Sequence, residues 1–203
     1  MEEISKVDAS VSVCMSVNNS LVCWGLEAYG TREQKEKYLV PLARGVKDGR
    51  LYIGAFLLSE PEAGSDATSQ RTTANDKGDH YLLNGTKNWI TNGTTASVYL
   101  VLAQTDREKG YRGISCFLVP KDDTVTVDKK EDKMGQRASN TATITFNDTE
   151  VDARYLLGEE NKGFKLAMMT LDRTRPGVAA MAVGIARAAF EFATEYSKER
   201  VQF

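Results

Sequence analysis

Residues 57–67 read LLSEPEAGSDA, and the character of the chain changes within them. The apolar run over residues 51–58 is typical of a buried strand, and it stops at Ser59. Pro61 fixes its own backbone, and Gly64 allows another group to approach closely. We therefore expect a strand that ends in a rigid turn and presents hydroxyl and carboxylate groups at one place.

The chain before this stretch is predicted to be helical, with a first helix over residues 1–29. Several residues recur near one face of that helix: Val7, Val11, Cys14, Met15, Asn18, Leu21, Val22 and Leu26. Gly30 ends the helix. Thr31 and Gln34 then have the spacing of a capping box, and they predict a second helical segment that ends at Gly45.

From residue 51 onward the apolar period changes to that of strands. Short segments rich in branched and aromatic residues are LYIGAFLL, DHYLLNG, SVYLVLAQ, GISCFLVP, TVTVD and TATITFND. The pairs at 84–85 and 92–93 are both Asn-Gly, a tight-turn signal. Closely spaced strands without intervening helices predict an antiparallel, barrel-like β-domain over residues 51–157.

After Gly158 the helical period returns and continues to the last residue. The predicted apolar stripe consists of Val178, Met181, Ile185, Ala188, Ala189, Phe192 and Tyr196. The sequence stops at Phe203 without a helix-ending signal, so we expect the chain to be part of a longer protein. The predicted fold class is α+β, with helices before and after a β-domain.

Composition excludes several classes of function. Lys plus Arg number 26 and Asp plus Glu number 28, a balance that gives no sign of nucleic-acid binding or of binding to a membrane surface. No apolar run in the sequence reaches the length of a membrane span, and no targeting peptide is evident. Three cysteines without metal or redox spacing suit a reducing compartment and are expected to be core residues.

Protein-only catalysis has little support in this sequence. His80 is the single histidine, and no G-x-S-x-G elbow accompanies it. Residues 158–165 read GEENKGFK, which lacks the Lys and hydroxyl residue of a phosphate-binding loop. Glu60 and Glu62 stand two apart, but two carboxylates from one turn rarely flank a sugar, so a solvated or structural role is favoured. If the protein is an enzyme, we expect a bound cofactor to supply its chemistry, and we expect no metal site.

Three segments together resemble the acyl-CoA dehydrogenase family, and the resemblance covers the whole chain. They are FLLSEPEAGSD at 56–66, NGTKNWITNG at 84–93, and the helical segment LDRTRPGVAAMAVGIARAAFEFATEYSKERVQF at 171–203. Residues 2–21 and 129–151 are similar to the short-chain (butyryl) branch. The resemblance implies the end of an N-terminal helical domain at 1–50, a flavin-contacting β-domain at 51–157, and the start of a C-terminal helical domain at 158–203.

By this resemblance the 56–66 turn contacts the flavin of FAD. Phe56, Leu58 and Ser59 would supply an apolar wall and hydrogen bonds, and Ser65 would meet both FAD and substrate. Asp66 is expected to cap its own turn. The family usually has a small residue where this chain has Leu57, so some repacking against the flavin is expected there.

The WIT segment and the last helical segment carry the other implied contacts. Trp89 and Thr91 would pack against the flavin and reach its N5 atom, with Ile90 contributing its backbone. The resemblance places Asp172 and Arg175 against the CoA portion of the substrate. The list of implied cofactor contacts is completed by Arg200, which would reach across a subunit interface to the FAD of a neighbour. In isolation, Trp89 would more often be a core residue and the charged residues would be surface residues.

The implied activity is FAD-dependent α,β-dehydrogenation of a short-chain acyl-CoA to a trans-2-enoyl-CoA. The catalytic base is expected beyond residue 203, so the isolated chain is expected to be inactive. Implied partners are acyl-CoA, an electron-transfer flavoprotein and further copies in a tetramer. The implied location is cytoplasmic in a bacterium or the mitochondrial matrix in a eukaryote. The alternatives are an acyl-CoA oxidase and a non-catalytic assembly module.

Overall fold

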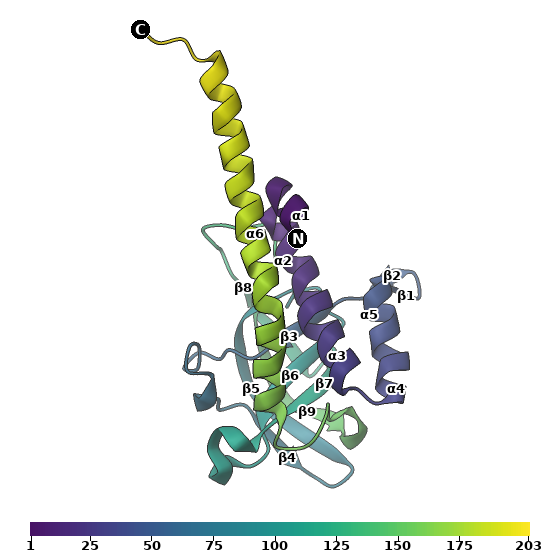
Figure 1. The fold of residues 1–203 in the computed structure, drawn as a ribbon. Helices are drawn as coiled ribbons and strands as arrows, with labels where there is room; N and C mark the ends of the chain where they lie inside the picture. The colour runs from purple at the N-terminus through teal and green to yellow at the C-terminus, as the bar shows by residue number, and fades with distance from the viewer.

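The computed structural model describes residues 1–203. Helices stack on one side of a curled sheet, and the last helix extends beyond both (Figure 1). The helical part before the sheet comprises α1 (Glu2–Val7), α2 (Ala9–Ser16), the π-helix η1 (Val17–Cys23), α3 (Trp24–Tyr29), α4 (Arg32–Gln34), the π-helix η2 (Lys35–Leu39) and α5 (Val40–Arg44). The prediction of an α+β chain with a β-domain between helices is confirmed.

The first helix is interrupted, which differs from the prediction of one helix over residues 1–29. Asp8 has extended backbone angles, and its side chain accepts a 2.6 Å hydrogen bond from the Ser10 amide, so it caps α2. Val7 and Val11, expected on the buried face, are exposed. The expected capping box is present, because Thr31 and Gln34 exchange reciprocal hydrogen bonds of 3.2 and 3.0 Å.

The strands are β1 (Val46–Lys47), β2 (Arg50–Leu51), β3 (Gly54–Leu57), β4 (Thr73–Asp76), β5 (His80–Thr91), β6 (Val98–Gln104), β7 (Ile114–Pro120), β8 (Val125–Lys130) and β9 (Thr141–Asp152). The first two form a separate small hairpin. The other seven form one sheet in the order β3-β6-β4-β5-β9-β8, with β7 also paired to β6. The 3₁₀ turns η3 (Ala67–Ser69) and η4 (Arg107–Gly113) lie between strands, and η5 (Ala153–Tyr155) lies between β9 and the last helix.

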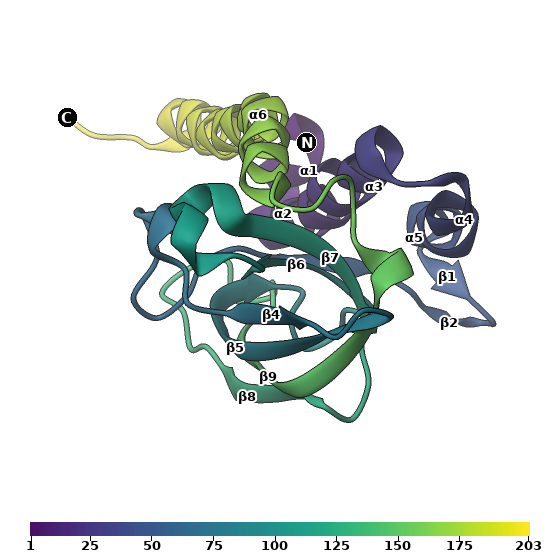
Figure 2. The ribbon, with the colours of Figure 1, turned by 90° about the horizontal axis from the view of Figure 1, so that it is seen from below.

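The sheet is curled like a half-barrel, as predicted, but it is mixed and not antiparallel throughout. Strands β3 and β4 both pair in parallel with β6, whereas the remaining pairs are antiparallel. Parallel neighbours are possible because β3 and β6 are separated by a long connection rather than a hairpin. Figure 2 shows the sheet curled around its own interior, with the helices on the β6–β7 side.

Two hydrophobic cores share the central strand β6. Alternate side chains of a strand point to opposite faces, and all seven residues of β6 are buried. Tyr99 and Val101 point into the barrel core, which also contains Phe117. Leu100 and Leu102 point into the second core, which lies between the sheet and the helices. This sharing fixes the helices against the outer face of the sheet.

One of the two predicted Asn-Gly turns is a bulge inside a strand. Residues 84–85 lie within β5, where the register against β9 shifts and Gly85 has φ 145°. A Cβ atom there would lie 2.5 Å from the Thr72 hydroxyl oxygen, so glycine is required. The pair at 92–93 does follow the end of β5 as a turn, with Asn92 at φ 65°.

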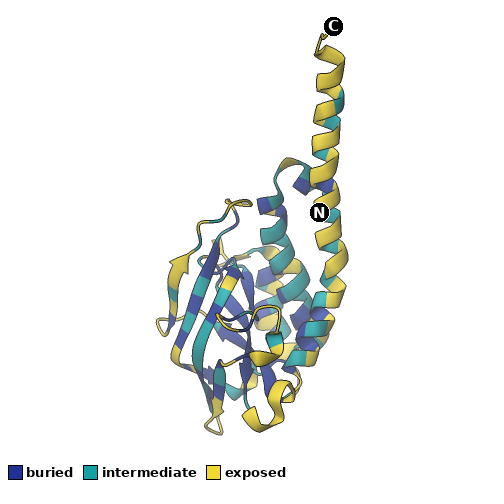
Figure 3. Ribbon diagram, turned by 90° about the vertical axis from the view of Figure 1, so that its left-hand side faces the viewer, coloured by how far each residue is buried: buried dark blue, intermediate teal, exposed yellow.

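The last helix, α6 (Gly163–Glu199), runs without a break through Pro176. Its first turns pack on the sheet, and its middle packs on α1, where Gly184 is essential because a Cβ atom would lie 2.3 Å from the Glu2 carbonyl oxygen. Beyond these contacts the C-terminal end of the helix projects into solvent (Figure 3). Of the predicted apolar stripe only Met181 is buried, and Phe192 is 77% exposed.

Two helical stretches, Ala9–Tyr29 and Gly163–Glu199, are long and apolar enough to cross a membrane, judged by length and composition alone. A core helix of a soluble protein passes the same test, so this is weak evidence. The absence of a membrane span stays a prediction.

We expect this chain to associate through the exposed part of α6. Phe190 and Phe192 are both more than two-thirds exposed, and Val183, Ile185 and Tyr196 of the same helix are exposed as well; exposed apolar surface of this kind drives association. The wild-type chain should bind a hydrophobic dye and form oligomers as its concentration rises, as measured by dye fluorescence and sedimentation. The Phe190→Ser/Phe192→Ser double variant should lose most of the dye binding and keep its melting temperature. A wild-type chain that stays monomeric and binds no dye would contradict this.

Candidate functional site

The turn after β3 is closed by its own backbone. Glu60 and Ala63 exchange hydrogen bonds of 3.0 and 3.2 Å around Pro61. Asp66 then caps η3 by accepting from the Thr68 amide at 3.2 Å, and its carboxylate also accepts from the hydroxyls of Thr68 and Ser69. These hydroxyl bonds lower the pKa of Asp66. The predicted local capping role of Asp66 is confirmed.

A buried ion pair joins this turn to β5. The Lys87 ammonium lies 2.8 Å from the Glu60 carboxylate, and the two side chains are 0% and 3% exposed. The same ammonium donates to the Leu58 carbonyl at 3.1 Å and to the Gln70 side chain at 2.9 Å. The other Glu60 oxygen accepts from the Arg71 amide at 2.6 Å. Of the solvated or structural role expected for Glu60, the structure shows the structural one.

The surroundings of the pair shift both pKa values. Burial favours the neutral form of Glu60, but the charge and hydrogen bond of Lys87 and the bonds from Thr72 and Arg71 outweigh it, so the pKa of Glu60 is lowered. Burial lowers the pKa of Lys87 to about 8, although Glu60 opposes that shift. The direct contact with Lys87 and the two amide donors support an ionised Glu60, so both groups are charged at neutral pH.

Strand β5 has a second bulge immediately after Lys87. The register against β9 shifts between Lys87 and Ile90, and Trp89 has φ 62°, which is unusual for a bulky residue. The Asn88 amide donates to the Ser59 carbonyl at 2.9 Å, so the bulge rests directly on the turn. As a result Trp89 is 62% exposed, whereas Ile90 points into the barrel core.

The structure brings the turn and the WIT segment together. The contact between them is the backbone hydrogen bond from the Asn88 amide to the Ser59 carbonyl, and not a contact between the predicted side chains. Phe56 and Ile90 are buried in two different cores. Leu58 is half-buried, and its carbonyl is held by Lys87. Leu57 is fully buried in the barrel core, so its expected repacking against a flavin has no support here.

Three hydroxyl groups in the turn and at the end of β5 form no hydrogen bond within the chain. Ser65 is exposed, and Ser59 and Thr91 are partly exposed. Their neighbours Thr68 and Ser69 are already engaged by Asp66. A flavin ring presents several acceptors and one N–H at its edge and a flat face, which free hydroxyls and an exposed indole can match. The donor set of Ser59, Ser65, Thr91 and Trp89 therefore fits FAD.

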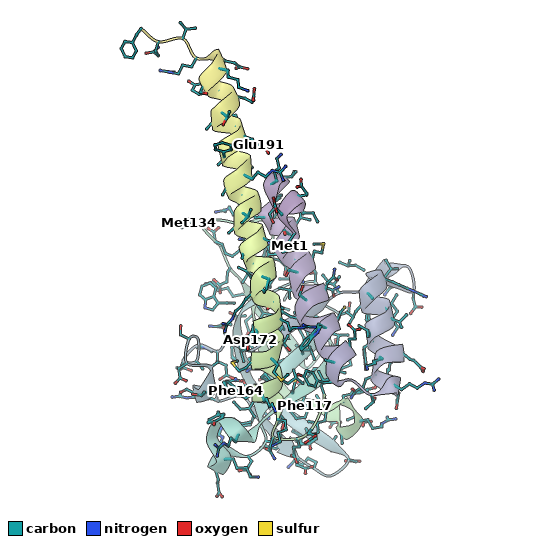
Figure 4. All side chains as sticks on the ribbon, in the orientation of Figure 1. Met1, Phe117, Met134, Phe164, Asp172 and Glu191 are labelled. Carbon is teal, nitrogen blue, oxygen red and sulfur yellow. The ribbon has the colours of Figure 1, made fainter.

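The predicted substrate and interface residues lie on α6. Asp172 and Arg175 form an exposed i,i+3 ion pair of 3.2 Å, and Figure 4 shows Asp172 on the part of α6 that lies over the β-domain. Arg200 follows the last turn of α6 at its projecting end, where it donates to the Tyr196 hydroxyl at 2.7 Å. The structure does not bring Arg200 near the turn.

Lys87 is the residue of this site that the sequence interpretation missed. It stands in the NGTKNW stretch of a strand that alternates buried and partly exposed residues. A lysine in such a strand, together with a glutamate at the end of an earlier apolar strand, is the only available signal. Neither residue reveals its partner, because they are 27 positions apart.

Three family models match successive parts of the chain. The N-terminal domain of acyl-CoA dehydrogenase matches residues 1–46, the middle domain matches residues 55–149, and the C-terminal domain matches residues 161–203. The chain belongs to the acyl-CoA dehydrogenase family.

Curated relatives agree with this assignment. The short-chain specific acyl-CoA dehydrogenase of Megasphaera elsdenii is 52% identical over 207 residues, which cover 100% of this chain and 52% of the relative. The mitochondrial short-chain specific acyl-CoA dehydrogenase of Mus musculus is 48% identical over 204 residues, which cover 100% and 48%. The chain thus spans about half the length of the curated relatives it matches.

Solved structures show the same fold. Butyryl-CoA dehydrogenase from Megasphaera elsdenii superposes with a TM-score of 0.95 at 50% identity, over 100% of this chain and 52% of that chain. A structure described as the electron transferring flavoprotein of Acidaminococcus fermentans gives 0.94 at 50% identity, with coverage of 100% and 52%. A structure described as an FAD-dependent dehydrogenase gives 0.91 at 30% identity, with coverage of 96% and 51%.

We predict that Glu60 makes stability depend on pH below about 4.5. Its folded pKa lies below the value of 4.5 for a free glutamate, so the unfolded chain binds more protons in that window. The Glu60 contribution is complete above pH 4.5 and is lost as the pH falls through the folded pKa. Glu60→Gln should be less stable at pH 7 by about 1–3 kcal/mol and show a smaller loss on acidification, measured by urea unfolding.

Glu62→Gln is the matched control, because Glu62 is an exposed carboxylate in the same turn. Its stability should stay within about 0.5 kcal/mol of the wild type. Equal pH slopes for Glu60→Gln and the wild type would show that Glu60 is not the group responsible.

We also predict that the Trp89 side chain does not stabilise the folded chain. Asparagine adopts the left-handed backbone more readily than tryptophan, so Trp89→Asn should leave the free energy of unfolding unchanged or raise it by up to about 1 kcal/mol. Trp24→Asn is the control, because Trp24 has an ordinary helical φ of −64° and is half-buried. A thermal melt in which Trp89→Asn destabilises as much as Trp24→Asn would contradict this.

Proposed function

We propose that the protein containing this chain oxidises a short-chain acyl-CoA to the trans-2-enoyl-CoA with FAD as its cofactor. The observation that carries the proposal is the group of free hydroxyls and exposed indole at the β5 bulge, held in place by a buried ion pair. The family and the short-chain names of its relatives point to the same chemistry.

The residues of this chain would bind and orient rather than transfer protons. Ser59, Thr91 and Trp89 would hold the flavin, and Phe56, Leu58 and Ile90 would support it through backbone and packing. Bound FAD supplies a two-electron acceptor, which no side chain provides. We assign no general base within residues 1–203, because neither Glu60 nor Glu191 is free: each carboxylate is engaged in an ion pair.

The substrate would be held at the same edge of the β-domain and on α6. Ser65 lies in the turn and carries a free hydroxyl, so it would contact both substrate and FAD. Arg175 and Asp172 offer a cation and an acceptor for the polar CoA portion. Arg200 would act on the FAD of a neighbouring subunit in a tetramer, which suits its position at the projecting end of α6.

The proposed electron acceptor is an electron-transfer flavoprotein, supported by the flavoprotein described for one similar structure. The proposed location is the cytoplasm of a bacterium or the mitochondrial matrix, in keeping with relatives from both. Two alternatives remain open. Oxygen consumption without an added acceptor would favour an acyl-CoA oxidase, and the absence of flavin bleaching by butyryl-CoA would favour a non-catalytic assembly module.

The test compares this chain with a chimera that joins it to the remaining half of the Megasphaera elsdenii relative. Both are assayed with butyryl-CoA, added FAD and an artificial electron acceptor. The chimera should turn over and the chain alone should not, because lack of a positioned base typically costs about 10²–10⁴-fold in rate. In the chimera, Thr91→Val should slow turnover and Thr126→Val, an exposed strand residue, should not. Comparable turnover by the chain alone would show that a base lies within residues 1–203.

A further inference from the structure

The Lys87 ammonium group uses all three of its donors on one loop. Its acceptors are the Leu58 carbonyl at 3.1 Å, the Glu60 carboxylate at 2.8 Å and the Gln70 side-chain oxygen at 2.9 Å. An ammonium group has three N–H donors and no acceptor, so it is saturated. None of the three acceptors lies on β5 itself, and every bond therefore crosses from the strand to the loop.

The three acceptors mark the beginning, the closed turn and the end of the loop over residues 58–70. Glu60 connects the residues after the loop to the same group, because it accepts from the amides of Arg71 and Thr72 at 2.6 and 3.1 Å. The Gln70 side chain also donates to the Ala67 carbonyl at 2.8 Å, which ties η3 to the same point. Both ends and the middle of the loop are therefore connected by hydrogen bonds to one atom, the Nζ of Lys87.

Stability alone is a poor explanation for this arrangement. A buried ion pair is often no more stabilising than apolar residues of the same volume, because both charges lose their hydration. Directional bonds from one fixed atom do, however, define geometry in a way that apolar packing does not. The strand that carries Lys87 also carries Thr91 and the Trp89 bulge, and the loop carries Ser59 and Ser65.

We propose that Lys87 is a positioning residue that sets the loop over residues 58–70 against the β5 bulge, and that it thereby fixes the spacing between the hydroxyls of Ser59 and Thr91. The inference rests on the proposed function, because that spacing matters for a ligand that contacts both groups. Lys87 itself is fully buried, so it would act through the loop and not by contact with solvent.

The test uses Lys87→Met and Glu60→Gln, which remove one charge each with little change of shape. Leu83→Ala is the matched control, because Leu83 is fully buried on the same strand and faces the barrel core. Amide hydrogen exchange is measured on the chain without cofactor, below the melting temperature of every variant. FAD affinity and the absorption band of the bound flavin are measured on the same variants of the chimera used to test the proposed function.

Both charge variants should raise exchange at Arg71 and Thr72 by about tenfold or more and leave β6 and β7 protected. They should also weaken FAD binding by about tenfold and shift the flavin band, whereas Leu83→Ala should do neither. Wild-type exchange in the loop of either charge variant would overturn the proposal, as would equal loss of FAD affinity in Leu83→Ala. A wild-type chimera that binds no FAD would count against the proposed function, and the exchange result would still decide the role of Lys87.

Discussion

The ion pair between Lys87 and Glu60 is the constraint on which the site depends. Both side chains are buried, and a buried charge without its partner destabilises the folded state by several kilocalories per mole. The loop and the strand are therefore stable only in the register that brings the two charges together. The backbone contact from Asn88 to Ser59 then follows at 2.9 Å. The exposed indole of Trp89 and the hydroxyls of Ser59 and Thr91 lie on the two segments that this ion pair joins.

The helices contribute by fixing what lies behind the sheet. Strand β3, which delivers the loop, is backed by η1 so closely that a Cβ atom at Gly54 would lie 2.6 Å from Val22. Asn18 bonds the Gly54 amide and the Leu42 carbonyl, and it thereby joins the helices before the sheet to the strand. The family assignment fits this picture, because the motifs that identify it are the segments that these contacts hold in place.

The features that local rules govern could be predicted from the sequence. The strands β6 and β7, the Thr31 capping box and the Asp66 cap each depend on neighbours within a few positions, and all are present. The break at Asp8 is also local and was missed, but the other features that failed depend on distant partners. The bulge at Gly85 exists because Thr72 lies against it, and the burial of Lys87 exists because Glu60 and Gln70 come from another strand connection. An Asn-Gly pair or a lysine has the same local signal in either setting.

The shared strand β6 has a consequence for how the chain loses its structure. The family models divide the chain into three successive parts, yet the side chains of β6 alternate between the barrel and the helix-facing layer. Neither layer can melt while the other keeps its packing, because each would leave half of the same strand without neighbours. The three parts that the family models define are therefore expected to unfold together and not one by one. Proteolysis of the folded chain would cut only at its loops and at the projecting end of α6.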